Sequence, residues 1–245
     1  MIETFCALLC AHVATDFLFQ TRRMALAKAD RAPGFLAAHL AILAVLSTAA
    51  ITPTDPAAAA LPLAIVVLSH LAIDLAKSLA PQDRLWPFMA DQGAHLAVLV
   101  LVAALWPGLW AAGYWAGINW LPGVMVLLTG LVLATRAGGF AVGLLMRPWA
   151  DVELPTGLPQ GGTLIGMLER GLIFILVLAG QPGGIGFLIA AKSVLRFEAT
   201  SKDQRAGEYV IIGTLASFGW ALAASYATLA LLAALPDLGI LPARP

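Results

Sequence analysis

The chain is divided almost from end to end into long apolar segments, and this pattern limits what it can fold into. A helix needs roughly 20 mostly apolar residues to cross the hydrocarbon core of a bilayer. Turn-forming runs such as residues 52–56 (TPTDP) and 181–184 (QPGG) separate the segments. We therefore predict an all-α integral membrane protein, a polytopic helical bundle of about seven to eight transmembrane helices. The candidate spans are Ile2–Gln20, Phe35–Thr52, Ala59–Leu79, Phe88–Leu109, Leu121–Met146, Thr163–Gly180, the short segment Gly183–Leu195, and Glu208–Leu235.

Composition agrees with a membrane environment. Hydrophobic residues make up 60% of the chain and charged residues 11%, whereas a soluble domain carries about 25% charged residues. The net charge is zero, so there is no basic field that would attract nucleic acid. We expect the lipid bilayer, and not a nucleic acid, as the partner of this chain. The sequence does not determine its oligomeric state.

Lysines and arginines are confined to alternate loops, which predicts the orientation of the chain. Cytoplasmic loops of membrane proteins carry an excess of these residues. The loops around Pro53, Trp110 and Pro182 hold none. We therefore expect a multi-pass protein of the bacterial inner membrane, with a periplasmic N-terminus and cytoplasmic basic loops. The basic residues of these loops are Arg22, Arg23, Lys28, Arg31, Lys77, Arg84, Arg147, Lys192, Arg196, Lys202 and Arg205.

All four histidines lie within the first four apolar segments, and three of them have an aspartate four residues away. Positions i and i+4 lie on one face of a helix, so the two side chains of each pair point in the same direction. Gln20 and Lys77 extend two of these faces, and Gln92 follows Asp91. The pairs are His12 with Asp16, His70 with Asp74 and Asp91 with His95, and the fourth histidine is His39.

These seven ionisable groups are predicted to lie at matching depths on the cytoplasmic side. At a rise of about 1.5 Å per residue, the aspartates and His39 lie roughly 4–8 Å inside the helix ends, and the other histidines roughly 10–14 Å. An aspartate near the middle of a span costs about 2.5–3.5 kcal/mol. The groups therefore need one another, a metal ion or a water-filled cavity, which predicts a functional polar site.

Histidine and carboxylate together form the usual ligand set for Zn, Mn or Fe, and four-helix bundles build metal sites from such inward-facing side chains. We expect one or two divalent ions here. A chain of His and Asp side chains also serves as a proton or ion relay in membrane proteins, and the sequence leaves this alternative open. The expected metal ligands are His12, Asp16, His39, His70, Asp74, Asp91 and His95.

A second group of charged residues lies in the C-terminal half of the chain. Its basic members are either ordinary anchors at the interface, paired with Glu169 or Glu208, or a cationic pocket for a phosphate or lipid head group. We expect a four-helix domain over residues 1–110 and a domain of further membrane helices over 111–245. The expected substrate-binding residues are Gln20, Gln92, Glu169, Arg170, Lys192, Arg196 and Glu208.

Three stretches carry a resemblance to a known family: residues 12–20 (HVATDFLFQ), 70–77 (HLAIDLAK) and 91–95 (DQGAH). They resemble the signature of a bacterial membrane family, the domain of unknown function 3307, over roughly Phe5 to Pro107. Residues 168–170, 191–197 and 208–215 look like the C-terminal region of its longer members. The resemblance implies no established activity. A more distant likeness to membrane-bound metal-dependent hydrolases is one of ligand pattern alone.

The function that these residues favour is a membrane-embedded, metal-dependent hydrolase acting on an anionic or lipid-linked substrate at the cytoplasmic face. Asp16, Asp74, Lys77 and Asp91 are its expected catalytic residues. The alternative is a cation or proton-coupled transporter that uses the same cluster. A transporter needs polar groups along the outer halves of its spans, and these halves are almost wholly apolar, which favours an enzyme. A scaffold that recruits a partner through its loops would leave the intramembrane histidines without a role.

Overall fold

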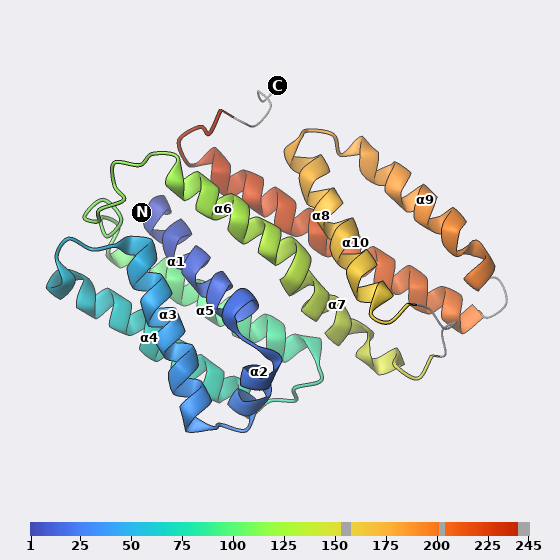
Figure 1. The fold of residues 1–245 in the computed structure, drawn as a ribbon, viewed down its shortest axis with the longest axis horizontal. Coiled ribbons are helices and arrows are strands. Elements are labelled where there is room, and N and C mark those ends of the chain that lie inside the picture. The colour runs from blue at the N-terminus through green and yellow to red at the C-terminus, as the bar shows by residue number, and fades with distance from the viewer. Residues whose placement is uncertain (153–157, 201–203, 240–245) are drawn as a thin grey trace. The chain divides into compact units, whose positions relative to one another are not determined.

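The computed structural model describes residues 1–152, 158–200 and 204–239, with the backbone alone for 195–200 (Figure 1). In these ranges the chain is helical, and its one β-type pairing is an isolated bridge between Pro53 and Gly113. The helices are α1 (Ile2–Ala14), η1 (Thr15–Phe19), α2 (Arg22–Ala29), α3 (Pro33–Ile51), α4 (Pro56–Lys77), α5 (Leu85–Leu105), α6 (Leu121–Val132), η2 (Leu133–Ala137), α7 (Gly138–Met146), η3 (Arg147–Trp149), α8 (Gly161–Leu178), α9 (Gly183–Thr200) and α10 (Gln204–Ala233).

Seven helical segments of the described chain are long and apolar enough to span a membrane, which confirms the predicted all-α polytopic bundle. The apolar part of α9, Gly183–Val194, is shorter than these seven. The predicted short segment is therefore a helix. The segments that qualify as spans are Ile2–Phe19, Pro33–Ile51, Pro56–Lys77, Leu85–Leu105, Leu121–Trp149, Gly161–Leu178 and Gln204–Ala233.

The chain forms two compact units whose boundary lies within α6. The first contains Met1–Thr129 with Leu231–Asp237, and the second contains Gly130–Ala230. The domain boundary predicted between residues 110 and 111 stays a prediction. Each unit carries one group of polar residues and is described by itself.

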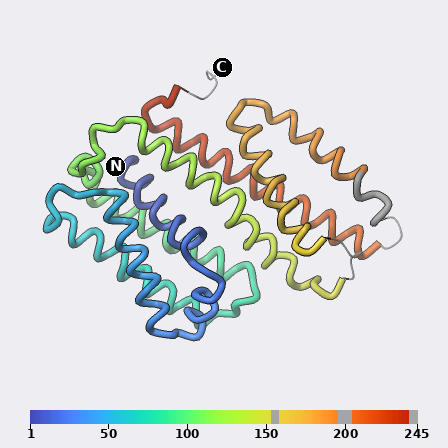
Figure 2. The backbone as a smooth tube through the Cα atoms, in the orientation of Figure 1, coloured from blue at the N-terminus to red at the C-terminus, as the bar shows by residue number. Residues whose placement is uncertain are grey.

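In the first unit, helices α1, α3, α4 and α5 form a four-helix bundle (Figures 1 and 2). Helix α1 packs against α3 and α5, and α4 packs against the same two helices, so the four helices close a ring. The short helix α2 contacts α3 and α4 and covers one end of the bundle.

Local sequence sets the helix ends in this unit. The Asp55 carboxylate accepts hydrogen bonds from the amides of Ala57 (2.9 Å) and Ala58 (3.2 Å), and Pro56 occupies the first position of α4. Aspartate at the N-cap and proline at the first helical position both favour a helix start. Helix α2 is capped in the same way, because the Thr21 hydroxyl accepts a hydrogen bond from the Met24 amide.

The interior of the bundle is layered. Each histidine has a buried aliphatic residue one turn further from the α2 end, on the same helix face as the histidine. Three of the histidines have their aspartate one turn closer to α2. From the covered end inward, the bundle therefore presents carboxylates, then imidazoles, then hydrocarbon. The aliphatic residues are Leu8, Leu43, Val66 and Leu99, all of them buried.

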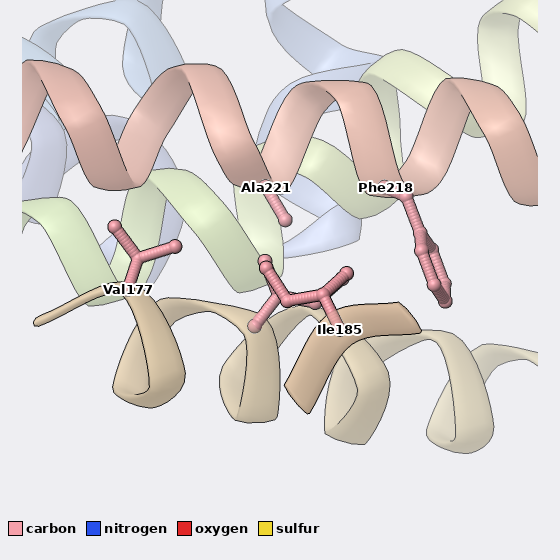
Figure 3. Close-up of a cluster of buried hydrophobic side chains, with 5 residues drawn as sticks. Val177, Ile185, Phe218 and Ala221 are labelled. Carbon is pink, nitrogen blue, oxygen red and sulfur yellow. The ribbon is translucent and has the colours of Figure 1, made fainter. Parts of the chain in front are cut away.

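In the second unit, an apolar core forms between helices α8, α9 and α10 (Figure 3). Val177 comes from α8, Ile185 from α9, and Phe218 and Ala221 from α10. Close approach between α6 and α10 depends on Gly130, where an added Cβ would collide with the Thr228 side chain. This packing holds the helices that line the charged cavity of the unit.

Candidate functional site

Asp16 lies on a widened turn of the first helix. Helix α1 continues into the π-helical turn η1, which begins at Thr15 and ends at Phe19. The Thr15 hydroxyl donates to the carbonyl of Ala11 (2.8 Å), which anchors the start of the turn. Such π turns are rare, and they occur frequently at functional sites. The turn directs the Asp16 carboxylate toward histidines of neighbouring helices.

The centre of the first unit is a pair of histidines flanked by two aspartates. The Nε2 atoms of His39 and His70 lie 2.9 Å apart. Asp16 Oδ1 lies 3.3 Å from His39 Nε2 and 3.5 Å from His70 Nε2. Asp74 Oδ2 lies 3.7 and 3.6 Å from the same two atoms. Four side chains from α3, α4 and η1 thus bring two nitrogens and two carboxylate oxygens together.

Five separations among these four side chains are close to those of ligands around one ion, and the shortest, between the two imidazole nitrogens, is also a hydrogen-bond distance. Two atoms that each bind a divalent ion at about 2.0–2.2 Å with tetrahedral geometry lie about 3.3–3.6 Å apart. The observed 2.9–3.7 Å brackets this value. The residues therefore fit a divalent metal by the nature of their donor atoms and by their spacing.

The other two histidines extend the cluster along α1 and α5. The His12 ring contacts the His95 ring at 4.8 Å between centroids, and the His70 ring contacts it at 4.1 Å. One donor atom each from His12, Asp16, His70 and His95 lies within 4.8 Å of the other three. Both ring nitrogens of His95 are buried and have no hydrogen-bond partner among the described residues. A buried imidazole without partners is costly, and a bound ion would satisfy it.

Gln92 connects two of the aspartates. Its amide nitrogen donates to Asp16 Oδ2 (3.2 Å) and to Asp91 Oδ2 (3.0 Å), and its Oε1 lies 3.4 Å from His12 Nε2. Asp74, Asp91 and His95 also offer donor atoms within 4.8 Å of one another. The seven predicted ligands thus lie in one continuous cluster.

Two lysines neutralise part of the cluster. Lys28 Nζ lies 2.6 Å from Asp74 Oδ2, and Lys77 Nζ lies 2.7 Å from Asp91 Oδ2. Asp16 is within ion-pair distance only of histidines among the described residues. The cluster contains three aspartates and two lysines, one acidic residue in excess, and this balance favours a cation over an anion as its ligand.

Access to the cluster lies at the α2 end of the bundle. A cavity of about 110 Å³ opens there between α2 and the C-terminal turn of α4. Its lining includes Gln20, which accepts a hydrogen bond from Lys28 (2.9 Å). The other polar lining residues are Lys28, Asp74, Lys77, Ser78 and Gln82. This cavity has room for a few water molecules next to Asp74.

In the second unit, three of the predicted substrate-binding residues line one cavity of about 500 Å³: Glu169, Arg170 and Lys192. Lys192 Nζ lies 2.7 Å from Glu169 Oε2. Glu208 lies outside that lining, is exposed, and accepts a hydrogen bond from Gln204 (2.9 Å). Arg196 lies outside the residues whose side chains are described.

The structure adds residues that the sequence prediction lacked. Lys28 was predicted only as a basic loop residue, yet it reaches Asp74 because α2 folds over the end of the bundle. In the second unit, the carbonyl of Thr135 and the hydroxyl of Ser217 bind Arg170. Neither residue belongs to a charged pattern in the sequence. Thr135 lies in the π turn η2, Leu133–Ala137.

These features define a class: a multi-pass helical membrane protein whose N-terminal bundle encloses a buried cluster of histidines and aspartates. Residues 4–115 match the model of a family described as protein of unknown function (DUF3307). This match confirms the expected resemblance to that family for the N-terminal half of the chain, and nothing in the comparisons supports the more distant likeness to metal-dependent hydrolases. All seven expected metal ligands lie within this range. Comparison with curated proteins and with solved structures gives no match.

Proposed function

We propose that the protein is a membrane-embedded, metal-dependent hydrolase acting on an anionic or lipid-linked substrate. The observation that carries the proposal is the spacing of His39 and His70 to Asp16 and Asp74. These side chains would hold one divalent ion (Zn, Mn or Fe), and His12, His95 and Asp91 would hold a second or orient the first. A bound ion of this kind lowers the pKa of its water and polarises the scissile group.

The lysines have separate roles in this proposal. Lys77 and Lys28 face the small cavity through which water and substrate would approach. Both are positioned to bind an anionic group of the substrate while their partner aspartates bind the ion. Gln92 would keep Asp16 and Asp91 in place through its two hydrogen bonds. Gln20 would hold Lys28 at the entrance.

The packing beyond the histidines supports an enzyme over a transporter. A transport path would have to continue from the histidines toward the bundle end opposite α2. That region is filled by Leu8, Leu43, Val66 and Leu99, each at most 3% exposed. A hydrolase needs access from one side alone, and the cavity at the α2 end offers it.

The test of the proposal is elemental analysis of protein purified in detergent without chelator. We expect one or two equivalents of Zn, Mn or Fe in the unaltered protein and less than a tenth of that in an Asp74→Ala/His70→Ala double variant. The control is Asp83→Ala, which removes an exposed carboxylate of the loop before α5. The metal-loaded protein is then screened against phosphate esters and phospholipids. Unaltered protein that is folded and takes up none of these metals on reconstitution contradicts the proposal.

We also propose that the α2 end faces the cytoplasm of a bacterial inner membrane. The support is the basic residues in and next to α2: Arg22, Arg23, Lys28 and Arg31. In intact cells, we expect a membrane-impermeant maleimide to label Ala57→Cys, at the start of α4, and to spare Asp83→Cys. In lysed cells both are labelled. The reverse pattern in intact cells would invert the orientation.

A further inference from the structure

Arg170 is a buried positive charge with only neutral partners. It is the tenth residue of the 18-residue span α8 and is 5% exposed. At about 1.5 Å per residue it lies about 13 Å from the start of the helix. Within the described part of the chain, no carboxylate lies within ion-pair distance of its guanidinium. The adjacent Glu169 is paired with Lys192.

The guanidinium is held in a fixed orientation. Its Nε and Nη2 donate to the carbonyl of Thr135 at 3.1 and 2.9 Å, and its Nη1 donates to Ser217 Oγ at 3.1 Å. A Cβ added at Gly138, Gly139 or Gly166 would lie 3.0–3.2 Å from the Arg170 side chain. These glycines form a cradle for the arginine. Three hydrogen bonds leave two of its five N–H groups for a ligand.

Arg170 lines the cavity of about 500 Å³ in this unit, which is large enough for a small-molecule ligand. The cavity lining contains three basic residues and one acidic residue, which leaves two positive charges in excess. The basic residues are Arg147, Arg170 and Lys192, and the acidic residue is Glu169. Hydroxyl groups of Thr163, Thr214 and Ser217 supply further donors. A phosphate group has the charge and the acceptor oxygens that such a site binds.

The remaining wall is hydrocarbon, contributed by Val142, Met146, Ile165 and Val210. An apolar wall beside a buried cation at mid-span suits an amphiphile better than a free ion. We propose that this cavity binds a phosphate-bearing lipid, with Arg170 as the principal contact of the phosphate. The site is formed within the second unit, and it does not depend on the metal site of the first.

The test is isothermal titration of the full-length protein in detergent with three probes: dioctanoyl phosphatidic acid, inorganic phosphate and dioctanoylglycerol. We expect saturable binding of phosphatidic acid, at least tenfold weaker binding of phosphate, and none of the phosphate-free lipid. Phosphate binding as tight as that of phosphatidic acid would assign the site to the free ion and contradict the proposal that it binds a lipid. Equal binding of the glycerolipid would overturn the role of the phosphate.

Two variants locate the binding in the cavity. Arg170→Gln removes the charge, and we expect at least a tenfold loss of affinity for phosphatidic acid. Gly143→Leu keeps every charged group and adds a bulky side chain to the cavity lining, at a position where an added Cβ meets no atom within 4 Å. We expect the same loss from it. This second variant keeps the test decisive if Arg170→Gln fails to fold.

The matched control is Gly219→Leu, the same substitution at an exposed glycine of α10 outside the cavity lining, where an added Cβ also meets no atom within 4 Å. We expect it to bind phosphatidic acid like the unaltered protein. Unchanged binding in a folded Gly143→Leu variant would overturn the proposal. Neither cavity substitution alters the first unit, so this proposal and the hydrolase proposal fail separately.

Discussion

Replacing Asp16 by asparagine is expected to weaken metal binding by about 100-fold and to abolish hydrolysis. The asparagine retains the shape of the aspartate but carries no charge, and one of its oxygens becomes an NH2 group. Asp16 lies within ion-pair distance of three of the four histidines. Its Oδ1 faces His39 and His70, and its Oδ2 binds Gln92 and lies 3.9 Å from His12.

The measurement is competition for Zn²⁺ against a chelating dye in detergent. The control is Asp30→Asn, which removes an exposed carboxylate that directly follows α2. A melting curve of the metal-free protein separates lost binding from lost folding. Wild-type metal affinity in a folded Asp16→Asn variant would exclude Asp16 as a ligand and weaken the case for a centre between His39 and His70.

Replacing Lys28 by methionine is expected to destabilise the metal-free protein and to make it depend on metal for stability. Removing one partner of a buried ion pair leaves an uncompensated charge and costs about 3–5 kcal/mol. The side chains of Lys28 and Asp74 are 11% and 6% exposed, so their ion pair qualifies as buried. For a chain of this size, the melting temperature falls by roughly 2–4 °C per kcal/mol. We expect a loss of about 6–20 °C.

Added Zn²⁺ should recover most of that loss, because the ion supplies the positive charge that Asp74 then lacks. Lys28 binds the same oxygen of Asp74 that faces His39 and His70. Removing the lysine therefore also frees this oxygen to bind the ion. Arg22→Met is the matched control, since it removes an exposed cation from the same short helix. A Lys28→Met protein that Zn²⁺ does not stabilise more than the unaltered protein would contradict a metal at Asp74.

The membrane spans could be predicted because apolar length and turn residues are local properties of the sequence. The predicted Leu121–Met146 segment corresponds to α6, η2 and α7 in succession. The convergence of the histidines and aspartates also followed from local spacing. Residues four apart share a helix face, and burial of charge forces such faces inward.

What the sequence did not predict depends on contacts between distant segments. Lys28 looked like an ordinary anchor in a basic loop, because its role follows from the way α2 folds over α3 and α4. Arg170 looked like one of several basic residues at the interface, with Glu169 or Glu208 as possible partners. In the structure, Glu169 pairs with Lys192, and the arginine binds a backbone carbonyl and a hydroxyl. Neutral partners of this kind leave no charge pattern in a sequence.

Both polar sites adjoin a π turn, Thr15–Phe19 in one unit and Leu133–Ala137 in the other. Such a turn holds one residue more than the regular helix would. Deleting that residue would restore regular hydrogen bonding and rotate all that follows by about 100° relative to what precedes it. The exposed Leu18 therefore tolerates exchange for another apolar residue but not removal. Among relatives of this protein, insertions and deletions should be rarer at these two turns than substitutions. The reason is that the number of residues in each turn determines how the side chains of its site are oriented.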